Sequence, residues 1–156
     1  MKQIFKYIAM SFVAAMALNA CQERYVQYEG AEYVMFADTL AVYPVMEGAD
    51  QFSIPVVSTV TRDYDRTFGV EVLDKLSNAI ERKHYSLESN TITIKAGETR
   101  ADVKVRGHFE NIGEADSLGF ALQLVMKDEL VMPLYGKQTK AVLMKTGKFD
   151  RSKFTG

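Results

Sequence analysis

Short runs in which apolar and polar residues alternate recur along most of this chain. From Gln51 to Val60 every second residue is apolar, with Ser58 as the single exception, and Gly119 to Met126 repeats the pattern without a break. Because successive side chains of a β-strand point to opposite faces, each run is expected to form a strand with one buried face. The alternation therefore restricts the chain to an all-β fold.

Further strands are predicted from β-prone composition at residues 33–36, 40–45, 66–74, 84–87, 91–94, 101–106 and 140–146. Pro44 lies within one of them. A proline cannot donate to a sheet ladder, so it indicates an edge strand or a strand that switches between sheets. Residues 76–87 lack the alternation, and we predict a crossing loop there with at most one helical turn.

The clearest hairpin is predicted from residues 91–94 and 101–106, with Ala96–Glu98 at its tip. In this arrangement four aliphatic side chains point inward, namely Ile92, Ile94, Val103 and Val105. Their polar neighbours point outward, as an antiparallel pair with one solvated face requires. The whole pattern predicts an antiparallel, immunoglobulin-like β-sandwich of seven to eight strands over residues 32–146.

The first 21 residues have the parts of an export signal. Lys2 and Lys6 precede an apolar run that is too short to cross a bilayer, and small residues lead to Cys21, the only cysteine. Leu18 to Cys21 resembles the lipobox of bacterial lipoproteins. The resemblance implies cleavage of a signal peptide at residues 1–20, lipidation of Cys21 and a polar tether over residues 21–31. The alternatives are a secretory signal followed by a free thiol, or an uncleaved anchor.

Charge and cysteine content exclude several classes of protein. Without residues 1–20 the chain has 17 basic and 20 acidic residues, and this slight negative charge argues against a nucleic-acid partner. A single cysteine excludes an internal disulfide framework and a cysteine-ligated zinc site. If Cys21 carries lipid, no thiol nucleophile remains, and the sandwich must be stable through packing alone.

Four short motifs resemble the Calx-β and related immunoglobulin-like modules. They are Val45-Met46-Glu47-Gly48, Ala79 followed by Tyr85, the Ile92–Gly97 stretch leading into Val103 and Val105, and Phe120–Leu124. Their order is similar to that in the amino-terminal module of Bacteroidota lipoproteins found near glycan-uptake machinery. The resemblance implies an outer-membrane lipoprotein that faces the cell surface, or otherwise the periplasm. Glu23, close behind Cys21, resembles the surface-export signal of these lipoproteins.

The resemblance also bears on calcium, because some Calx-β modules bind it. Glu47 matches a ligand position, and Glu110 and Asp116 are weak further candidates. Adjacent aspartates, which those modules carry late in the domain, are missing here. Calcium takes six to eight oxygen ligands, so these three carboxylates require converging loops to form a site. We therefore expect no metal and no other cofactor.

No catalytic motif accompanies the two histidines, His84 and His108, and we predict that the protein is not an enzyme. Exposed aromatic rings are the remaining candidates for ligand contact, since a sugar can stack on them. Tyr43, Tyr64 and Tyr135 are expected at loops or strand ends.

Two functions remain open. The first is a non-catalytic spacer or protein-interaction module, whose partners are the membrane, through Cys21, and other surface lipoproteins. The second is a module that captures polysaccharide directly. Residues 147–156 belong to no predicted strand and are interpreted as a linker to a missing or truncated second domain.

Overall fold

The computed structural model describes residue 28 and residues 30–114 and 117–147. The predicted leader, Cys21, Asp116 and residues 148–156 of the tail lie outside the described residues. Within the described ranges there are nine strands, which correspond to the nine segments with strand-like sequence and exceed the seven to eight strands predicted for the sandwich. They are β1 (Val34–Phe36), β2 (Leu40–Val45), β3 (Gln51–Ser58), β4 (Arg66–Val72), β5 (Tyr85–Leu87), β6 (Thr91–Ile94), β7 (Arg100–Gly107), β8 (Leu118–Val125) and β9 (Gln138–Lys145).

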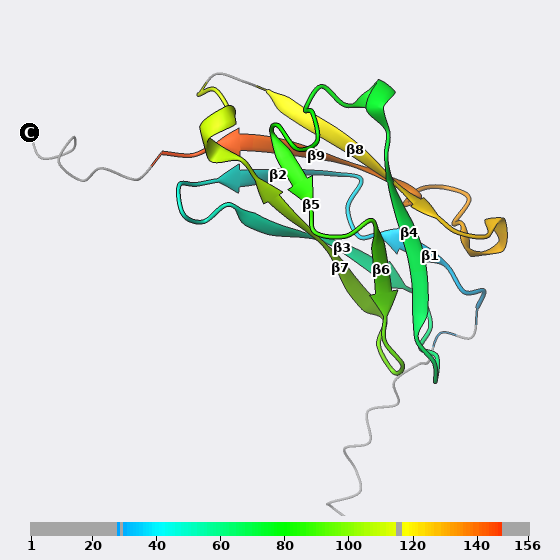
Figure 1. Ribbon diagram of the computed structural model, residues 1–156. Coiled ribbons are helices and arrows are strands. Elements are labelled where there is room, and N and C mark those ends of the chain that lie inside the picture. Colours follow the sequence, from blue (N-terminus) through cyan, green and yellow to red (C-terminus); the bar gives the residue numbers. More distant parts are fainter. Residues whose placement is uncertain (1–27, 29, 115–116, 148–156) are drawn as a thin grey trace, which may run out of the picture.

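The strands form two sheets that make a β-sandwich (Figure 1). The first sheet has the order β1-β3-β7-β5, and the second has the order β2-β9-β8-β4-β6. Neighbours pair antiparallel, apart from β2 and β9, which are parallel. The all-β sandwich that the alternation predicted is therefore confirmed.

The parallel pair arises because the chain changes sheets between β1 and β2. Phe36 ends a strand of the first sheet, and Leu40 begins the edge strand of the second, beside Lys140 of β9. Pro44 lies on that edge strand. The open side of an edge strand has no neighbouring strand to accept a hydrogen bond, so the missing N–H of the proline removes no ladder hydrogen bond there. The edge position predicted from the proline is confirmed.

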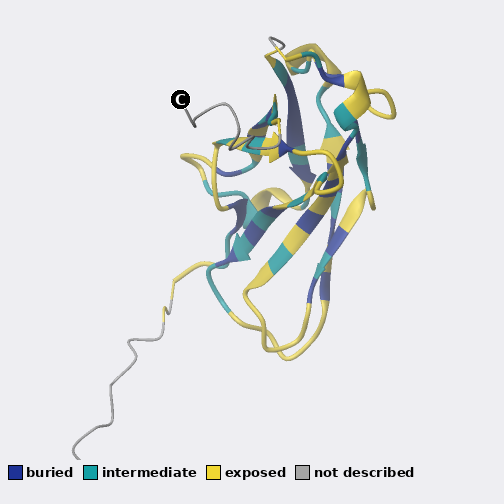
Figure 2. Ribbon diagram, turned by 90° about the vertical axis from the view of Figure 1, so that its left-hand side faces the viewer, coloured by how far each residue is buried: buried dark blue, intermediate teal, exposed yellow. Residues whose placement is uncertain are grey.

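The core lies between the sheets and is built from the inward-facing residues of both. Buried residues alternate with exposed ones along the strands (Figure 2), as in β7, where Val103 and Val105 are buried and Asp102 and Lys104 are exposed. Near its centre the fully buried ring of Tyr85 stacks on Phe120, with ring centroids 3.9 Å apart. This contact joins the two sheets, because β5 and β8 belong to different ones.

The predicted hairpin of residues 91–94 with 101–106 is wrong. β6 pairs with β4 in the second sheet, whereas β7 pairs with β3 and β5 in the first. The connection therefore crosses the sandwich instead of turning within one sheet. Its tip is bound to the β3–β4 loop, because Asp65 accepts a hydrogen bond from the Ala96 backbone N–H (2.9 Å) and pairs with Lys95 (2.7 Å). All four aliphatic side chains of the predicted hairpin do point inward, since both sheets face the same core.

The crossing segment between β4 and β5 contains a single 3₁₀ turn, η1 (Asp74–Leu76), in agreement with the prediction. Asn78 follows this turn by two residues. Its side chain accepts a hydrogen bond from Gly119 N–H (2.6 Å) and donates one to the carbonyl of Ser117 (2.9 Å), which fixes the segment to β8. Two more 3₁₀ turns, η2 (Phe109–Asn111) and η3 (Asp128–Leu130), lie in the last two connections. Over the described ranges, no helix has the length and hydrophobicity needed to cross a bilayer.

The pairing of β6 can be tested with engineered disulfides in a Cys21→Ser background. Thr67 of β4 and Thr93 of β6 are opposite in register, and their hydroxyl oxygens lie 2.8 Å apart. We expect Thr67→Cys with Thr93→Cys to form a disulfide on mild oxidation, measured as loss of thiol alkylation by mass spectrometry. Opposite pairs in antiparallel strands have the Cβ separation that a disulfide requires.

The matched control is Thr93→Cys with Asp102→Cys. These two residues would be opposite each other in a β6–β7 hairpin, but they lie on the outer faces of different sheets. They should remain reduced, and efficient cross-linking of this pair instead of the first would contradict the observed topology.

Candidate functional site

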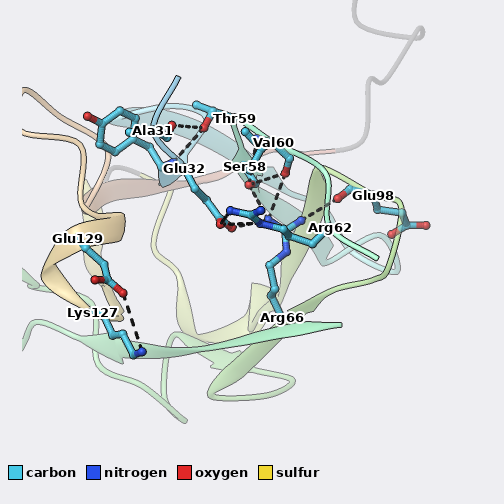
Figure 3. Close-up of polar contacts among 11 residues, drawn as sticks. Ala31, Glu32, Ser58, Thr59, Val60, Arg62, Arg66, Glu98, Lys127 and Glu129 are labelled. Carbon is cyan, nitrogen blue, oxygen red and sulfur yellow. Dashed lines mark hydrogen bonds and ion pairs between the residues drawn. The ribbon is translucent and has the colours of Figure 1, made fainter. Parts of the chain in front are cut away.

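A cluster of charged side chains lies where the chain enters the sandwich. Because β1 runs antiparallel to β3, with Val34 opposite Ser58, the residues just before β1 meet the β3–β4 loop. Glu32 comes from the entering segment, and Arg62 and Arg66 come from that loop and the start of β4. Figure 3 shows both guanidinium groups directed at the Glu32 carboxylate. We call these three residues the entry cluster.

Arg66 is the buried member of the entry cluster, with 6% of its surface exposed. Its Nη1 donates to Glu32 Oε1 (2.7 Å) and to the hydroxyl of Ser58 (2.8 Å). The carbonyl oxygens of Val60 (3.1 Å) and Glu98 (2.9 Å) accept further hydrogen bonds from the same guanidinium. A buried charge is tolerated only with such partners, so the Arg66 guanidinium can be buried here only because these hydrogen bonds form.

Ser58 explains the exception in the alternation of β3. It is an inward-facing, buried position at the end of that strand, and its hydroxyl accepts the Arg66 hydrogen bond instead of packing in the core. Sequence reasoning found the exception but not its partner. The sequence did contain a signal for this buried pair. A polar residue stands at a core position, and an arginine follows eight residues later at the start of the next strand.

Glu32 joins both arginines. Its Oε2 accepts hydrogen bonds from Arg62 Nε (2.9 Å) and Nη2 (2.7 Å), while Oε1 binds Arg66. Burial favours the protonated acid, but the hydrogen bonds from Arg62 and Arg66 outweigh it, so the pKa of Glu32 lies below its ordinary value. The carboxylate therefore stays ionised and holds the two cations together.

Main-chain contacts hold the same entering segment. The Thr59 hydroxyl accepts a hydrogen bond from Tyr33 N–H (2.9 Å) and donates one to the carbonyl of Ala31 (3.1 Å). Thr59 N–H in turn donates to the carbonyl of Tyr33 (3.0 Å). The entry cluster and Thr59 thus fix residues 31–33 to the end of β3 by both side-chain and backbone bonds.

The chemistry of this cluster is that of a structural joint. Its carboxylate and both guanidinium groups are bound to one another and to backbone carbonyls, so none is positioned to transfer a proton or to attack a substrate. No group of three or more metal-ligating side chains occurs among the described residues.

The three candidate tyrosines come from different elements of the sandwich. Tyr43 lies within β2 and stacks on Phe52 of β3 at 4.3 Å between ring centroids, so it closes the sandwich edge between the sheets. Burial, together with the charges of nearby aspartates, raises its pKa. Tyr64, in the β3–β4 loop, and Tyr135, in the β8–β9 connection, are both about half exposed.

The structure describes two of the three calcium candidates. Glu47 lies in the exposed turn between β2 and β3, and Glu110 lies in η2 of the β7–β8 connection. Both connections are at the end of the sandwich opposite the entry cluster. Asp116 is outside the described residues, and the structure does not show the three carboxylates together.

The histidines lie beside β5. His84 is buried, and its Nδ1 accepts a hydrogen bond from Ile80 N–H (2.9 Å). His108 Nδ1 is 3.1 Å from the carbonyl of Lys83, which can only accept, so Nδ1 carries a hydrogen, and Nε2 lies 3.2 Å from the Ser86 hydroxyl oxygen. A backbone carbonyl, not a carboxylate, orients this ring, unlike a Ser-His-Asp triad.

Comparison with known proteins supports the fold. No protein-family model matches the chain, and no curated protein is significantly similar to it. The apo-form Calx CBD1 domain is similar in structure, with a TM-score of 0.56 at 14% identity; the match covers 75% of this chain and 99% of that domain.

Two Bacteroides structures are also similar. A two-domain protein of unknown function from Bacteroides fragilis gives a TM-score of 0.52 at 15% identity, covering 75% of this chain and 46% of that one. A proposed carbohydrate-binding protein from Bacteroides ovatus gives 0.50 at 14% identity, covering 72% and 37%. The chain thus spans less than half the length of both, and these likenesses show the fold alone. That fold is a Calx-β-like sandwich, as the sequence motifs predicted.

The entry cluster predicts a pH-dependent contribution to stability. We expect Glu32→Gln to lower the free energy of unfolding at pH 7 by about 2 kcal/mol, measured by urea denaturation, because Arg66 loses a charged acceptor while it remains buried. A pKa lowered by folding stabilises the protein above the ordinary carboxyl value of 4.5, and this stabilisation is lost as the pH falls through the folded value. The loss on acidification should therefore be smaller in the variant.

Glu88→Gln is the matched control, because Glu88 is exposed and lies 4.0 Å from Lys104. It should change stability by less than about 0.5 kcal/mol. Equal effects of the two substitutions would show that the entry cluster has no special role.

Proposed function

We propose that this protein is a non-catalytic lipoprotein of the cell envelope, anchored through Cys21, whose sandwich acts as a spacer and protein-interaction module for a glycan-uptake assembly. The observation that carries the proposal is the position of the chain's entry and exit. They lie at opposite ends of the sandwich, and the entry is fixed by the charged cluster.

Strand register defines the two ends. β1 begins beside the end of β3, whereas β9 ends at Lys145, beside Val45 at the end of β2, and a short turn leads from there to the start of β3. In Figure 1, β1 and the end of β9 accordingly lie on opposite sides. The eight residues of β3 span roughly 26 Å. A module of this kind separates the segment that follows β9 from the segment that precedes β1 by about the length of β3.

A spacer also needs a firm joint at the anchored end. Force or thermal motion of the tether acts first on residues 31–33, which precede a β1 of three residues. The hydrogen bonds of Glu32 and Thr59 supply attachment that such a short strand lacks. An anchor at Cys21 would act on this end of the sandwich first, so a joint at residues 31–33 supports the proposal.

The non-catalytic part of the proposal draws on the histidines and the comparisons. His108 has no acidic partner in its hydrogen bonds, and the Glu32 carboxylate accepts hydrogen bonds from both arginines of the entry cluster. None of the three similar structures named above is described as an enzyme.

Direct capture of polysaccharide is the second candidate function. It is favoured by a polar hollow on the outer face of the first sheet and by the likeness to the proposed carbohydrate-binding protein of Bacteroides ovatus. The two functions are compatible, because they use different parts of the sandwich. The hollow lies on the outer face of a sheet, whereas the spacer function depends on the two ends of the sandwich.

The spacer proposal predicts which end faces the membrane. Cells producing the protein should incorporate labelled palmitate, and Cys21→Ser should abolish the incorporation. In the lipidated protein on nanodiscs, a donor dye on Asp63→Cys, in the exposed β3–β4 loop, should transfer energy to lipid-borne acceptors more efficiently than a dye on Glu114→Cys, in the exposed β7–β8 connection.

Palmitate incorporation that is unaffected by the substitution would overturn the anchor. Equal transfer from the two dyes, or the reverse order, would overturn the spacer orientation while leaving the anchor intact. The two parts of the proposal therefore fail separately.

A further inference from the structure

Six polar side chains form two rows on the outer face of the first sheet. Register places Gln51, Arg106 and Ser86 side by side across β3, β7 and β5. Ser53 lies opposite Lys104 in the second row, which Glu88 extends, since its N–H donates to the carbonyl of Lys104 (3.0 Å). Neighbouring strands are about 4.8 Å apart, and side chains on one face of a strand recur at about 6.7 Å.

These side chains line a hollow of about 450 Å³. They include an amide, two hydroxyls, a carboxylate and two cations. Phe52 and Val105 also line the hollow, but Val105 is buried and the Phe52 ring stacks on Tyr43. A hollow of this composition suits a ligand with several hydroxyl groups and a negative charge better than an apolar ligand. We call it the sheet groove.

The two cations at its centre have unused hydrogen-bonding capacity. Lys104 lies 4.0 Å from Glu88, and Arg106 lies 3.9 Å from Asp50, both beyond hydrogen-bond distance. Arg100, on the same strand, instead donates two hydrogen bonds to Asp102 at 3.1 and 3.2 Å. The ammonium and guanidinium donors of the sheet groove are therefore available to a ligand, and both side chains are more than half exposed.

One hydroxyl of the sheet groove is already oriented. Ser86 Oγ lies 3.2 Å from His108 Nε2, and the ring is fixed by the bond between its Nδ1 and the carbonyl of Lys83. When the Ser86 proton is directed to the ring, the oxygen's lone pairs remain for a ligand hydroxyl. His108 is thus a positioning residue for Ser86.

We propose that the sheet groove binds a carboxylate-bearing sugar unit of an acidic polysaccharide, a refinement that rests on the second candidate function. The planar guanidinium of Arg106 takes the carboxylate in a paired geometry, and Lys104 adds a second positive charge. Gln51, Ser53, Ser86 and Glu88 bind the ring hydroxyls. Because the Phe52 ring already stacks on Tyr43, binding depends on charge and is weakened by salt.

Affinity electrophoresis of the full chain in mild detergent tests this proposal, with polygalacturonate as the acidic polymer and galactan as the neutral one. We expect retardation by polygalacturonate only. Arg106→Gln should raise the polymer concentration for half-maximal retardation at least about tenfold, as the loss of a charge-assisted contact predicts. Arg100→Gln removes the same charge from the same strand but outside the sheet groove, and should change it less than about twofold.

Three results would overturn the proposal. They are no retardation by polygalacturonate, equal losses in Arg106→Gln and Arg100→Gln, and equal retardation by poly-glutamate, which would indicate binding of any polyanion. Unchanged thermal unfolding of the two variants controls for misfolding. The nanodisc measurement does not involve the sheet groove, so failure here leaves the spacer proposal standing.

Discussion

The burial of the Arg66 guanidinium is the interaction on which the entry end of the sandwich depends. Removing a charge from water costs several kcal/mol unless its donors find acceptors. Those acceptors come from three separate stretches: Glu32 before β1, Ser58 and Val60 at the end of β3, and Glu98 in the β6–β7 crossing. Each stretch must be in place for the others to be satisfied, so one side chain sets the arrangement of the whole end.

This dependence gives a role to β1, one of the two shortest strands of the first sheet. β1 has three residues and pairs only with β3, too little to be stable by itself. Contacts at both of its ends compensate. Glu32 and Thr59 hold the residues before it. At its other end the N–H of Phe36, its last residue, donates to the carbonyl of Gly136 (2.8 Å), and the N–H of Ala37 donates to that of Pro55 (3.0 Å). β1 is thus held at both of its ends, and this fixes the place where the chain passes from the first sheet to β2 in the second.

The sequence could reveal which residues face the core, but not which strands are neighbours. Alternation reports the direction of side chains, and Ile92 and Val103 point inward whether β6 and β7 form a hairpin or cross the sandwich. The choice depends on long-range contacts such as the bond between Asp65 and Ala96, which leave no periodic trace. The entry cluster was missed for a related reason. An arginine at the start of a strand is usually exposed, and only the polar exception at Ser58 indicated a buried partner.

The edges of both sheets limit how this module can meet another protein. A long open edge invites pairing with a further strand, and proteins suppress it with short strands and proline. Here β1 and β5 have three residues each and β6 has four, while the longer edge strand β2 contains Pro44. Strand addition is therefore disfavoured at all four edges. Contacts with a partner or ligand fall instead to the ends and outer faces of the sandwich, where both the entry cluster and the sheet groove lie.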